Sequence, residues 1–394
     1  MTRPTIQAAA PAALLAGALL LTACGTAPEP ATNAAAQPAA TASRPAVTDP
    51  LVLTYDGGLY VVDGRSLKLV EDIPLAGYNR VNPAGDDRHV LVSTSTGFRV
   101  LDAASATLKD DEFKGVKPGH VVRHAGRTVL FADGTGEVTL FDPRELAAGL
   151  PEGEVYRAAT AHHGVAIELA DGELVITLGT EEKRTGIAVL DKERKEITRS
   201  EQCPGVHGEA AAQGEAVVLG CEDGVILYKD GEISKIDSPD EYGRIGNQAG
   251  SDLSPVVLGD YKKDPDAELE RPTQVSLIDT AKGTLKLVDL GTSYTFRSLA
   301  RGPRGEALVL GTDGAVHVID PVAGKVVRTV EVLGAWKEPL DWQRPRPNLF
   351  VRGQVGYVSD PDGRRLHAVD LASGKVTGST SLPQPPNELS GVAG

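Results

Sequence analysis

Aromatic residues and cysteines are scarce in this 394-residue chain, and acidic residues outnumber basic ones. Phe, Trp and Tyr together make up 4% of the chain, and its two tryptophans, Trp336 and Trp342, give no support to the Trp-rich stacking that holds the cofactor of quinone-dependent dehydrogenases. The formal net charge of −14 argues against a nucleic-acid partner and is compatible with the attraction of cations.

A membrane-spanning run is also missing at the N-terminus. The stretch "AAAPAALLAGALLLTAC" is too short and too rich in small residues for a stop-transfer helix, and it ends in "LTAC", Leu21 to Cys24, which has the form of a bacterial lipobox. We interpret residues 1–23 as a lipoprotein signal peptide that is cleaved before Cys24, whose thiol is then acylated. The protein would then be exported and lipid-anchored to the outer face of the cytoplasmic membrane. A plain secretory signal and an uncleaved anchor are the alternatives.

Residues 24–48 contain almost no large apolar side chains. After Cys24 the sequence reads "GTAPEPATNAAAQPAATASRPAVT", which cannot bury enough surface to offset the entropy of ordering it. We therefore predict that residues 24–48 form a disordered tether and that residues 49–394 form the folded domain.

Two cysteines remain once Cys24 is set aside, Cys203 and Cys221. An exported protein with two remaining cysteines is expected to pair them in a disulfide. Here the disulfide would pin the loop "CPGVHGEA", which carries His207. The alternative is that one or both thiolates bind a metal ion.

The strongest signal in the sequence is an internal repeat. A short strand of alternating apolar residues that ends in Asp returns eight times at intervals of about 40 to 50 residues, as in "LYVVDGRS" and "VHVIDPVAG". The eight acids are Asp63, Asp102, Asp142, Asp191, Asp230, Asp279, Asp320 and Asp370. Each such strand has a strand before it, often through a "DG" turn, and another after it, which indicates a four-stranded antiparallel blade repeated around a ring. We predict an all-β fold, a single β-propeller of eight four-stranded blades, with a structural turn role for the repeated Asp. Seven blades is the alternative if one unit is degenerate.

The first repeat lacks its innermost strand. It begins directly at "LVLTYDGGLYVVD", whereas the last repeat is followed by "PPNELSGVAG". We predict that this C-terminal segment supplies the missing strand, so that both ends of the chain close the first blade and leave no open sheet edge.

Four of the eight histidines fall where the chain enters an innermost strand. His120 lies there in the third repeat, His162 and His163 in the fourth, and His207 in the fifth. Because innermost strands line the central channel of a propeller, three successive blades are expected to bring imidazoles to one arc of a channel mouth. The remaining histidines are expected to be structural or surface residues; they are His89, His124, His317 and His367.

Three converging neutral imidazoles with an open or carboxylate fourth position suit Zn²⁺. The same set suits Cu²⁺ or Ni²⁺, which the ligand type alone does not separate. Glu209, in the adjacent "GE", is a candidate fourth ligand or a hydrogen-bond acceptor behind a ligand. The alternative is that these histidines are polar channel residues that bind only water.

No catalytic arrangement emerges from the sequence. It contains no Gly-x-Ser-x-Gly elbow, no Gly-rich nucleotide loop and no His-Glu-x-x-His. Because a propeller fold does not specify a function, three hypotheses stand. The first is a zinc-binding metallochaperone, the second a surface-anchored interaction module without physiological metal, and the third, the least supported, a propeller enzyme such as a lyase or a quinone-dependent dehydrogenase.

Several stretches resemble the AztD family of extracytoplasmic zinc metallochaperones. They are "CPGVHGEAAAQGEAVVLGCEDGVILY", "PGHVVRHAGRTVLFADGTGEVTLFD", "AHHGVAIELADGELV", "LGTDGAVHVIDP", "DWQRPRP" and "PNELSG". The likeness runs over most of the chain from around Tyr78 to the C-terminus. The resemblance implies a propeller that binds Zn²⁺, hands it to the solute-binding protein of a zinc ABC importer and is not an enzyme.

On this resemblance, His120, His163 and His207 match the histidine-bearing motifs of the family and are the expected zinc ligands, with His162 in place of His163 if the register shifts by one. Cys203 and Cys221 match the paired cysteines of the family. The chain departs from family members that carry a His-rich N-terminal segment, because its tether contains no histidine. The tether would then only anchor the protein, or zinc capture would proceed without such a segment.

Overall fold

The structure is a computed structural model that describes residues 46–393. The predicted signal peptide, the acylated Cys24 and most of the predicted tether lie outside the described residues, so they and the domain boundary stay predictions. The first ordered contact of the described chain is made by Val47, which is buried and whose N–H donates to the Ala104 carbonyl at 2.8 Å.

Among residues 46–393, no helix has both the length and the hydrophobicity needed to cross a bilayer.

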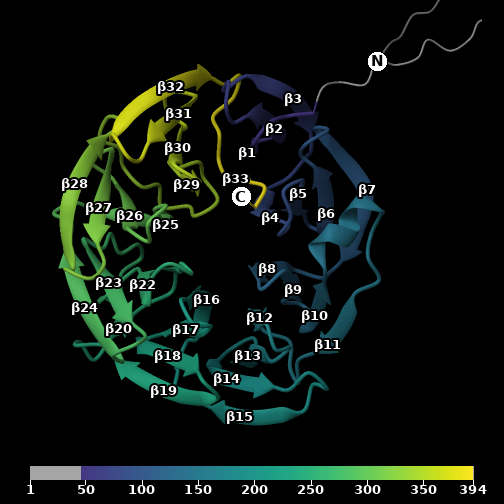
Figure 1. Cartoon of the computed structure of the whole chain (residues 1–394), viewed down its shortest axis with the longest axis vertical. Coiled ribbons are helices and arrows are strands. Elements are labelled where there is room, and N and C mark those ends of the chain that lie inside the picture. Colours follow the sequence, from purple (N-terminus) through teal and green to yellow (C-terminus); the bar gives the residue numbers. More distant parts are fainter. Residues whose placement is uncertain (1–45, 394) are drawn as a thin grey trace, which may run out of the picture. The chain divides into compact units, whose positions relative to one another are not determined.

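Eight antiparallel sheets form a closed ring around a central channel (Figure 1). Each sheet has four main strands, which follow in sequence order from the channel outward in seven of the sheets, whereas the eighth has the C-terminal strand innermost. One sheet carries a fifth, two-residue strand, β20 (Gly243–Arg244), that pairs in parallel with its third strand. The prediction of an eight-bladed propeller with four-stranded blades is confirmed, and the seven-blade alternative is wrong.

Each blade contributes one strand to each of four concentric layers, and the strands of a layer follow in order from blade 1 to blade 8. The innermost strands are β33 (Leu389–Gly391), β4 (Arg80–Pro83), β8 (Pro118–His124), β12 (Ala166–Glu168), β16 (His207–Ala212), β21 (Gln248–Ala249), β25 (Tyr294–Arg301) and β29 (Leu349–Arg352). The second strands are β1 (Pro50–Tyr55), β5 (His89–Ser93), β9 (Arg127–Ala132), β13 (Leu174–Gly179), β17 (Ala216–Cys221), β22 (Val256–Gly259), β26 (Ala307–Gly311) and β30 (Val355–Asp360).

The two outer layers complete the blades in the same order. The third strands are β2 (Gly58–Asp63), β6 (Gly97–Asp102), β10 (Glu137–Phe141), β14 (Arg184–Leu190), β18 (Asp223–Lys229), β23 (Gln274–Asp279), β27 (Ala315–Asp320) and β31 (Arg365–Asp370). The outermost strands are β3 (Leu69–Pro74), β7 (Thr107–Lys114), β11 (Glu154–Arg157), β15 (Glu196–Ser200), β19 (Glu232–Asp237), β24 (Thr284–Asp289), β28 (Lys325–Glu331) and β32 (Lys375–Ser381). One short 3₁₀ helix, η1 (Pro143–Ala147), lies between β10 and β11.

Both ends of the folded chain build the first blade, as predicted. Strand β33 pairs antiparallel with β1, with Leu51 opposite Gly391 and Leu53 opposite Leu389. The pairing continues beyond the strand, because the N–H of Thr54 donates to the Glu388 carbonyl at 3.0 Å. The C-terminal strand therefore lies near the centre of the ring (Figure 1) and closes the sheet edge that blade 1 would otherwise expose.

The repeated Asp is a turn residue, as the sequence indicated. In seven of the eight blades its carboxylate accepts a backbone N–H from two to four residues further on, as Asp320 does from Val322 and Ala323 at 2.9 Å. Asp230 is the exception: it and Gly231 both have positive φ, 52° and 81°, which the tight hairpin turn there requires.

The core lies between neighbouring blades, where the middle strands are covered on both faces. Every residue of β17 is buried, whereas the outermost strand β28 alternates between exposed and covered positions. The largest apolar cluster spans blades 3 to 5 and includes Phe131, Val165 and Val206. It lies directly beside the residues that enter the innermost strands of these blades, and so gives them a rigid base.

Candidate metal centre

The three histidines favoured by the sequence meet at the entry to the innermost strands of blades 3, 4 and 5. His120 lies in β8, His163 in the loop before β12, and His207 is the first residue of β16. One ring nitrogen of each lies within 4.8 Å of those of the other two. The ring centroids are 5.0 to 5.4 Å apart. We call these three residues the histidine arc.

Irregular backbone at the start of β8 and β16 accompanies this arrangement. The pairing of β8 with β9 shifts register between Pro118 and Val121, and that of β16 with β17 shifts between His207 and Ala210. Such bulges re-aim side chains at the rim of a sheet. In β16 the bulge depends on Gly208, whose φ is 69° and where a Cβ would lie 2.3 Å from the Gln248 side-chain oxygen.

Each imidazole of the histidine arc has an oxygen behind its Nδ1. His163 Nδ1 lies 2.6 Å from Asp133 Oδ2, and His207 Nδ1 lies 2.5 Å from the Gly246 carbonyl. His120 Nδ1 is 3.7 Å from a Glu209 carboxyl oxygen. Because a carboxylate or a carbonyl can only accept, the Nδ1 atoms of His163 and His207 carry the protons, and their Nε2 atoms present lone pairs. This is the arrangement that orients histidines as metal ligands.

The two free nitrogens face each other at the spacing of a shared ion. His163 Nε2 and His207 Nε2 are 3.0 Å apart. Two nitrogen ligands of a tetrahedral zinc ion, each 2.0–2.1 Å from the metal, would be about 3.3 Å apart. The arc is therefore close to the geometry of ligation with little rearrangement, and a cation between the lone pairs would relieve their mutual repulsion.

Burial keeps His207 and His120 uncharged. It lowers the pKa of His207 to about 3, with a further contribution from the His163 ring and the nearby Arg244 and Arg184. It also lowers the pKa of His120 well below the usual value, with the His207 and His163 rings acting in the same direction. Burial raises the pKa of Glu209 to about 8, so that this carboxyl is mostly protonated at neutral pH. Neutral imidazoles bind a metal ion without first losing a proton.

The neighbouring His162, the predicted substitute for His163, points elsewhere. Its side chain is buried, with Nδ1 2.8 Å from the Thr160 carbonyl and Nε2 3.0 Å from the Thr177 hydroxyl. The ring also meets Phe131 edge-on at 5.2 Å between centroids. Both nitrogens of His162 are already used, so the structure places His163 and not His162 in the arc.

The four histidines expected to be structural have acidic neighbours instead of one another. Nδ1 of His89 lies 2.6 Å from Asp86, Nε2 of His124 lies 2.6 Å from Glu215, and Nε2 of His317 lies 3.0 Å from Asp313. His367 lies 3.9 Å from Asp360.

A disulfide holds the loop that leads to His207. Cys203 precedes β16, Cys221 is the last residue of β17, and the two are bonded with a Cα–Cα distance of 4.9 Å. Both are fully buried in the apolar cluster of blades 3 to 5. The Cys221 carbonyl accepts the Ile245 N–H at 3.0 Å, so the disulfide also helps to fix the segment that leads to Gly246. The cysteines are a structural pair here and not metal ligands.

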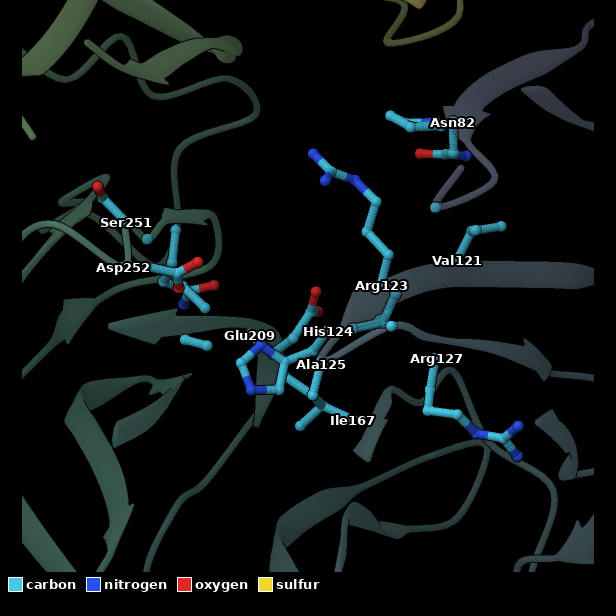
Figure 2. A pocket seen from close by; sticks show the side chains of 18 residues that line it. Asn82, Val121, Arg123, His124, Ala125, Arg127, Ile167, Glu209, Ser251 and Asp252 are labelled. Atoms are coloured by element: carbon cyan, nitrogen blue, oxygen red, sulfur yellow. The ribbon is translucent and has the colours of Figure 1, made fainter. Parts of the chain in front are cut away.

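A polar cavity of about 500 Å³ occupies the channel on one side of the site. Glu209 lines it together with Arg123, His124 and Asp252. Figure 2 shows Glu209 within this cavity, with Arg123 on one side of the opening and Asp252 on the other. Glu209 therefore reaches His120 from the channel interior.

Sequence reasoning missed Asp133, Gly246, Arg184 and Arg244 as neighbours of the site. Asp133 belongs to the "DG" turn of blade 3, "LFADGTGE", and such turns recur in several blades, so its position looked purely structural. Gly246 contributes only its backbone carbonyl, for which the side-chain sequence carries no signal. A comparison of the turns in blades 3 and 4 could have found Asp133, because the turn of blade 3 faces the entry to blade 4 in a propeller.

Comparisons with known proteins agree with this fold and with the motif resemblance. No protein-family model matches the chain. The "Zinc chaperone AztD" of Citrobacter koseri is 24% identical to it over 305 residues, which cover 75% of this chain and 70% of the relative. This match confirms the resemblance seen in the motifs.

Solved structures show the same architecture. The structure of apo AztD from Citrobacter koseri superposes with a TM-score of 0.75 at 21% identity, covering 88% of this chain and 98% of that one. The dihydro-heme d1 dehydrogenase NirN superposes with a TM-score of 0.61 at 12% identity, over 90% of this chain and 78% of that one. At these identities the superpositions establish the fold alone.

Proposed function

We propose that this protein is an extracytoplasmic zinc metallochaperone that binds one Zn²⁺ through His120, His163 and His207 and passes it to the solute-binding protein of a zinc ABC importer. The observation that carries the proposal is the convergence of three imidazoles, two of which direct unprotonated Nε2 atoms at each other across 3.0 Å. The likeness to a zinc chaperone supports zinc as the cargo over copper or nickel.

Transfer by stepwise ligand exchange suits this site. Three neutral ligands leave a fourth position open, where an incoming ligand adds before any histidine has left. The side chain of His163 is 44% exposed and that of His120 is 22% exposed, so His163 is the first ligand that an acceptor would reach and replace. The oxygens behind the imidazoles then hold the emptied rings in place for the next ion.

Acylation of Cys24 would keep the propeller at the outer face of the membrane, beside an importer. A tether of 24 residues, 25–48, rich in Ala and Pro, gives the folded domain room to reach a partner there. The anchor, the partner and the location are parts of the same proposal.

The alternative of an interaction module without physiological metal explains the site less well. Three imidazoles turned toward one another, two of them buried enough to stay neutral, cost desolvation and lone-pair repulsion, which a site that never holds a cation would have no reason to retain. The likeness to a chaperone also favours transfer over catalysis, and we assign no reaction to this site.

The experiment is a measurement of zinc content and zinc affinity in the tag-free protein and in the double variant His120→Ala with His207→Ala. We expect one tight site per chain in the wild type and its loss in the double variant. The matched control is His367→Ala, which removes an imidazole from blade 8 and should retain the site. Unchanged zinc binding in the double variant would contradict the assignment.

Delivery is tested separately with the zinc-loaded protein and a zinc solute-binding protein. Direct transfer predicts that the rate of zinc movement rises with acceptor concentration and exceeds the rate of spontaneous release into excess chelator. A rate equal to spontaneous release at every acceptor concentration would reduce the protein to a zinc store.

A further inference from the structure

Two arginines lie beside the histidine arc in a chain whose net charge is −14. Arg184 begins β14 in blade 4, and its carbonyl accepts the N–H of Gly205, two residues before His207. Arg244, in β20, donates from Nη1 to the carbonyl of the same Gly205 at 3.3 Å. Both therefore flank the loop that presents His207.

The Arg184 guanidinium has unused hydrogen-bonding capacity. Its Nη1 is buried and has no hydrogen-bond partner among the described residues. Its charge contributes to the lowered pKa of both His120 and His207. The chain's own carboxylates near the two arginines are Glu222, which is 3.6 Å from Arg244 Nη1 and also interacts with Arg184, and Asp133, which holds His163. A buried N–H without an acceptor is costly, so this donor is suited to an oxygen that arrives from outside.

Glu209 lines the channel cavity, whereas neither Arg184 nor Arg244 is among its lining residues. The side chain of His163 is 44% exposed, so a ligand can reach the histidine arc there. The two guanidinium groups belong to residues that contact Gly205 of the His207 loop, and they favour an anionic ligand over a neutral one.

We propose that Arg184 and Arg244 form a receiving site for a carboxylate beside the loop that presents His207 to the histidine arc. An acidic side chain of the acceptor would bind these arginines first and then become the first ligand to add to zinc. The inference rests on the proposed function and specifies the chemistry of the partner group, an aspartate or glutamate.

The replacement of an imidazole by a carboxylate on zinc involves no change of oxidation state. The carboxylate oxygen donates an electron pair to zinc, the Zn–N bond to one imidazole breaks, and that Nε2 regains its lone pair. The arginines offset the carboxylate charge during approach, when it has left water but is not yet bound to the metal. Once zinc leaves with the acceptor, Arg184 returns to its unpaired state and is ready for the next cycle.

The test uses the zinc-loaded full chain and two small chelators that differ in charge. Nitrilotriacetate presents carboxylates, whereas a neutral tetrakis(pyridylmethyl)ethylenediamine presents only nitrogen donors. Zinc removal by each is followed in the wild type, in Arg184→Gln, in Arg244→Gln and in the double variant. Lys117→Gln, which removes a cation near the entry to blade 3 that is paired with Glu181, is the matched control.

We expect the double Arg variant to lose zinc to nitrilotriacetate at least about fivefold more slowly than the wild type, with removal by the neutral chelator unchanged. The advantage of the carboxylate chelator in the wild type should shrink as salt is raised, because screening weakens the attraction. Arg184→Lys should retain part of the effect, since it keeps the charge and loses the planar fork.

Equal slowing for both chelators would overturn the proposal, because it would reveal a general distortion of the site. Unchanged rates for both chelators would overturn it as well. Failure of the wild type to hold one zinc ion would overturn the proposed function itself, so the two failures are distinguishable.

Discussion

Two arcs of one channel mouth use polar side chains in opposite ways. Opposite the histidine arc, the entries to the innermost strands of blades 7, 8 and 1 carry two ion pairs, Arg297–Glu388 and Arg346–Glu338, which we call the arginine arc. All four side chains are less than 10% exposed. Both guanidinium groups also lie over the ring of Phe296, at 5.0 and 5.2 Å from its centroid.

In the arginine arc the charges are neutralised within the fold. Arg297 also donates to the Asn387 side chain and to the Tyr78 hydroxyl, each at 2.7 Å, and Arg346 donates to the Asp341 carbonyl at 2.8 Å. In the histidine arc the fold satisfies the protonated nitrogens of His163 and His207 and leaves their Nε2 atoms turned toward each other. We infer from this difference that the arginine arc stabilises the closed ring, whereas the histidine arc is arranged to accept a cation.

Breaking an ion pair in the arginine arc distinguishes the roles of the two arcs most clearly, because it should affect stability and not zinc binding. Glu388→Ala should lower the free energy of unfolding by about 3–5 kcal/mol, because it leaves the charge of Arg297 buried without its counter-ion. Chemical denaturation in the presence of a chelator measures this loss. Zinc stoichiometry of the folded fraction should remain one per chain.

The control for Glu388→Ala is the double variant Arg297→Met with Glu388→Leu, which removes both charges and keeps most of the volume. It should recover most of the lost stability. A loss below about 1 kcal/mol in Glu388→Ala would contradict the structural role of the arginine arc, since it would match an exposed pair.

The disulfide between Cys203 and Cys221 lies next to the histidine arc, and it should affect both stability and zinc binding. Cys203→Ala with Cys221→Ala should lower the free energy of unfolding by about 3 kcal/mol for a loop of this length. Because the disulfide fixes the segments that lead to His207 and Gly246, zinc affinity should fall as well. The arginine-arc variants, in contrast, should keep their zinc affinity. Thermal unfolding and zinc competition measure the two effects. Full zinc affinity in this variant would show that the position of His207 does not depend on the disulfide.

Features that repeat along the chain could be predicted from the sequence. The eight strands ending in Asp form a local pattern that repeats, so the blade number and the closure by the C-terminal strand were predictable from it. His120, His163 and His207 were predictable as a group because each enters an innermost strand of a successive blade. The choice between His162 and His163 was not, because it depends on which ring the Thr160 carbonyl and the Thr177 hydroxyl capture.

The hydrogen-bonded side-chain pairs between blades were not predicted from the sequence. Arg297 and Glu388 are 91 residues apart, and Asp133 and His163 are 30 apart. No periodicity marks such pairs, since each partner occupies an ordinary turn or strand entry of its own blade. They become visible only when the ring brings the blades together.

A smaller effect is expected from the acceptor behind His163. Asp133→Asn keeps the size of the side chain and weakens the hydrogen bond that orients the imidazole, so zinc affinity should fall about tenfold with little change in stability. The matched control is Asp313→Asn, which alters a carboxylate that contacts His317 from the corresponding turn of blade 7. Zinc competition assays should separate the two variants. Equal affinities would mean that His163 is oriented by packing alone.

The smallest change in zinc affinity is expected with pH. In the folded protein burial lowers the pKa of His207 to about 3 and that of His120 well below its usual value, whereas both return to about 6.5 in the unfolded chain. Below pH 6.5 the unfolded chain therefore binds more protons, and the stability of the zinc-free protein should fall as the pH is lowered toward 3. Zinc binding to these two imidazoles needs no deprotonation over the same range.

Zinc affinity measured between pH 7.5 and 6.0 should consequently fall by about fivefold at most, against about fiftyfold for three imidazoles of ordinary pKa. Competition with a chelator of known pH dependence gives this number directly. The arginine arc offers the internal reference, because Arg297→Met with Glu388→Leu should leave the pH profile of zinc affinity unchanged. A fiftyfold fall would mean that the histidines titrate as exposed groups, and that burial does not hold them neutral for the cation.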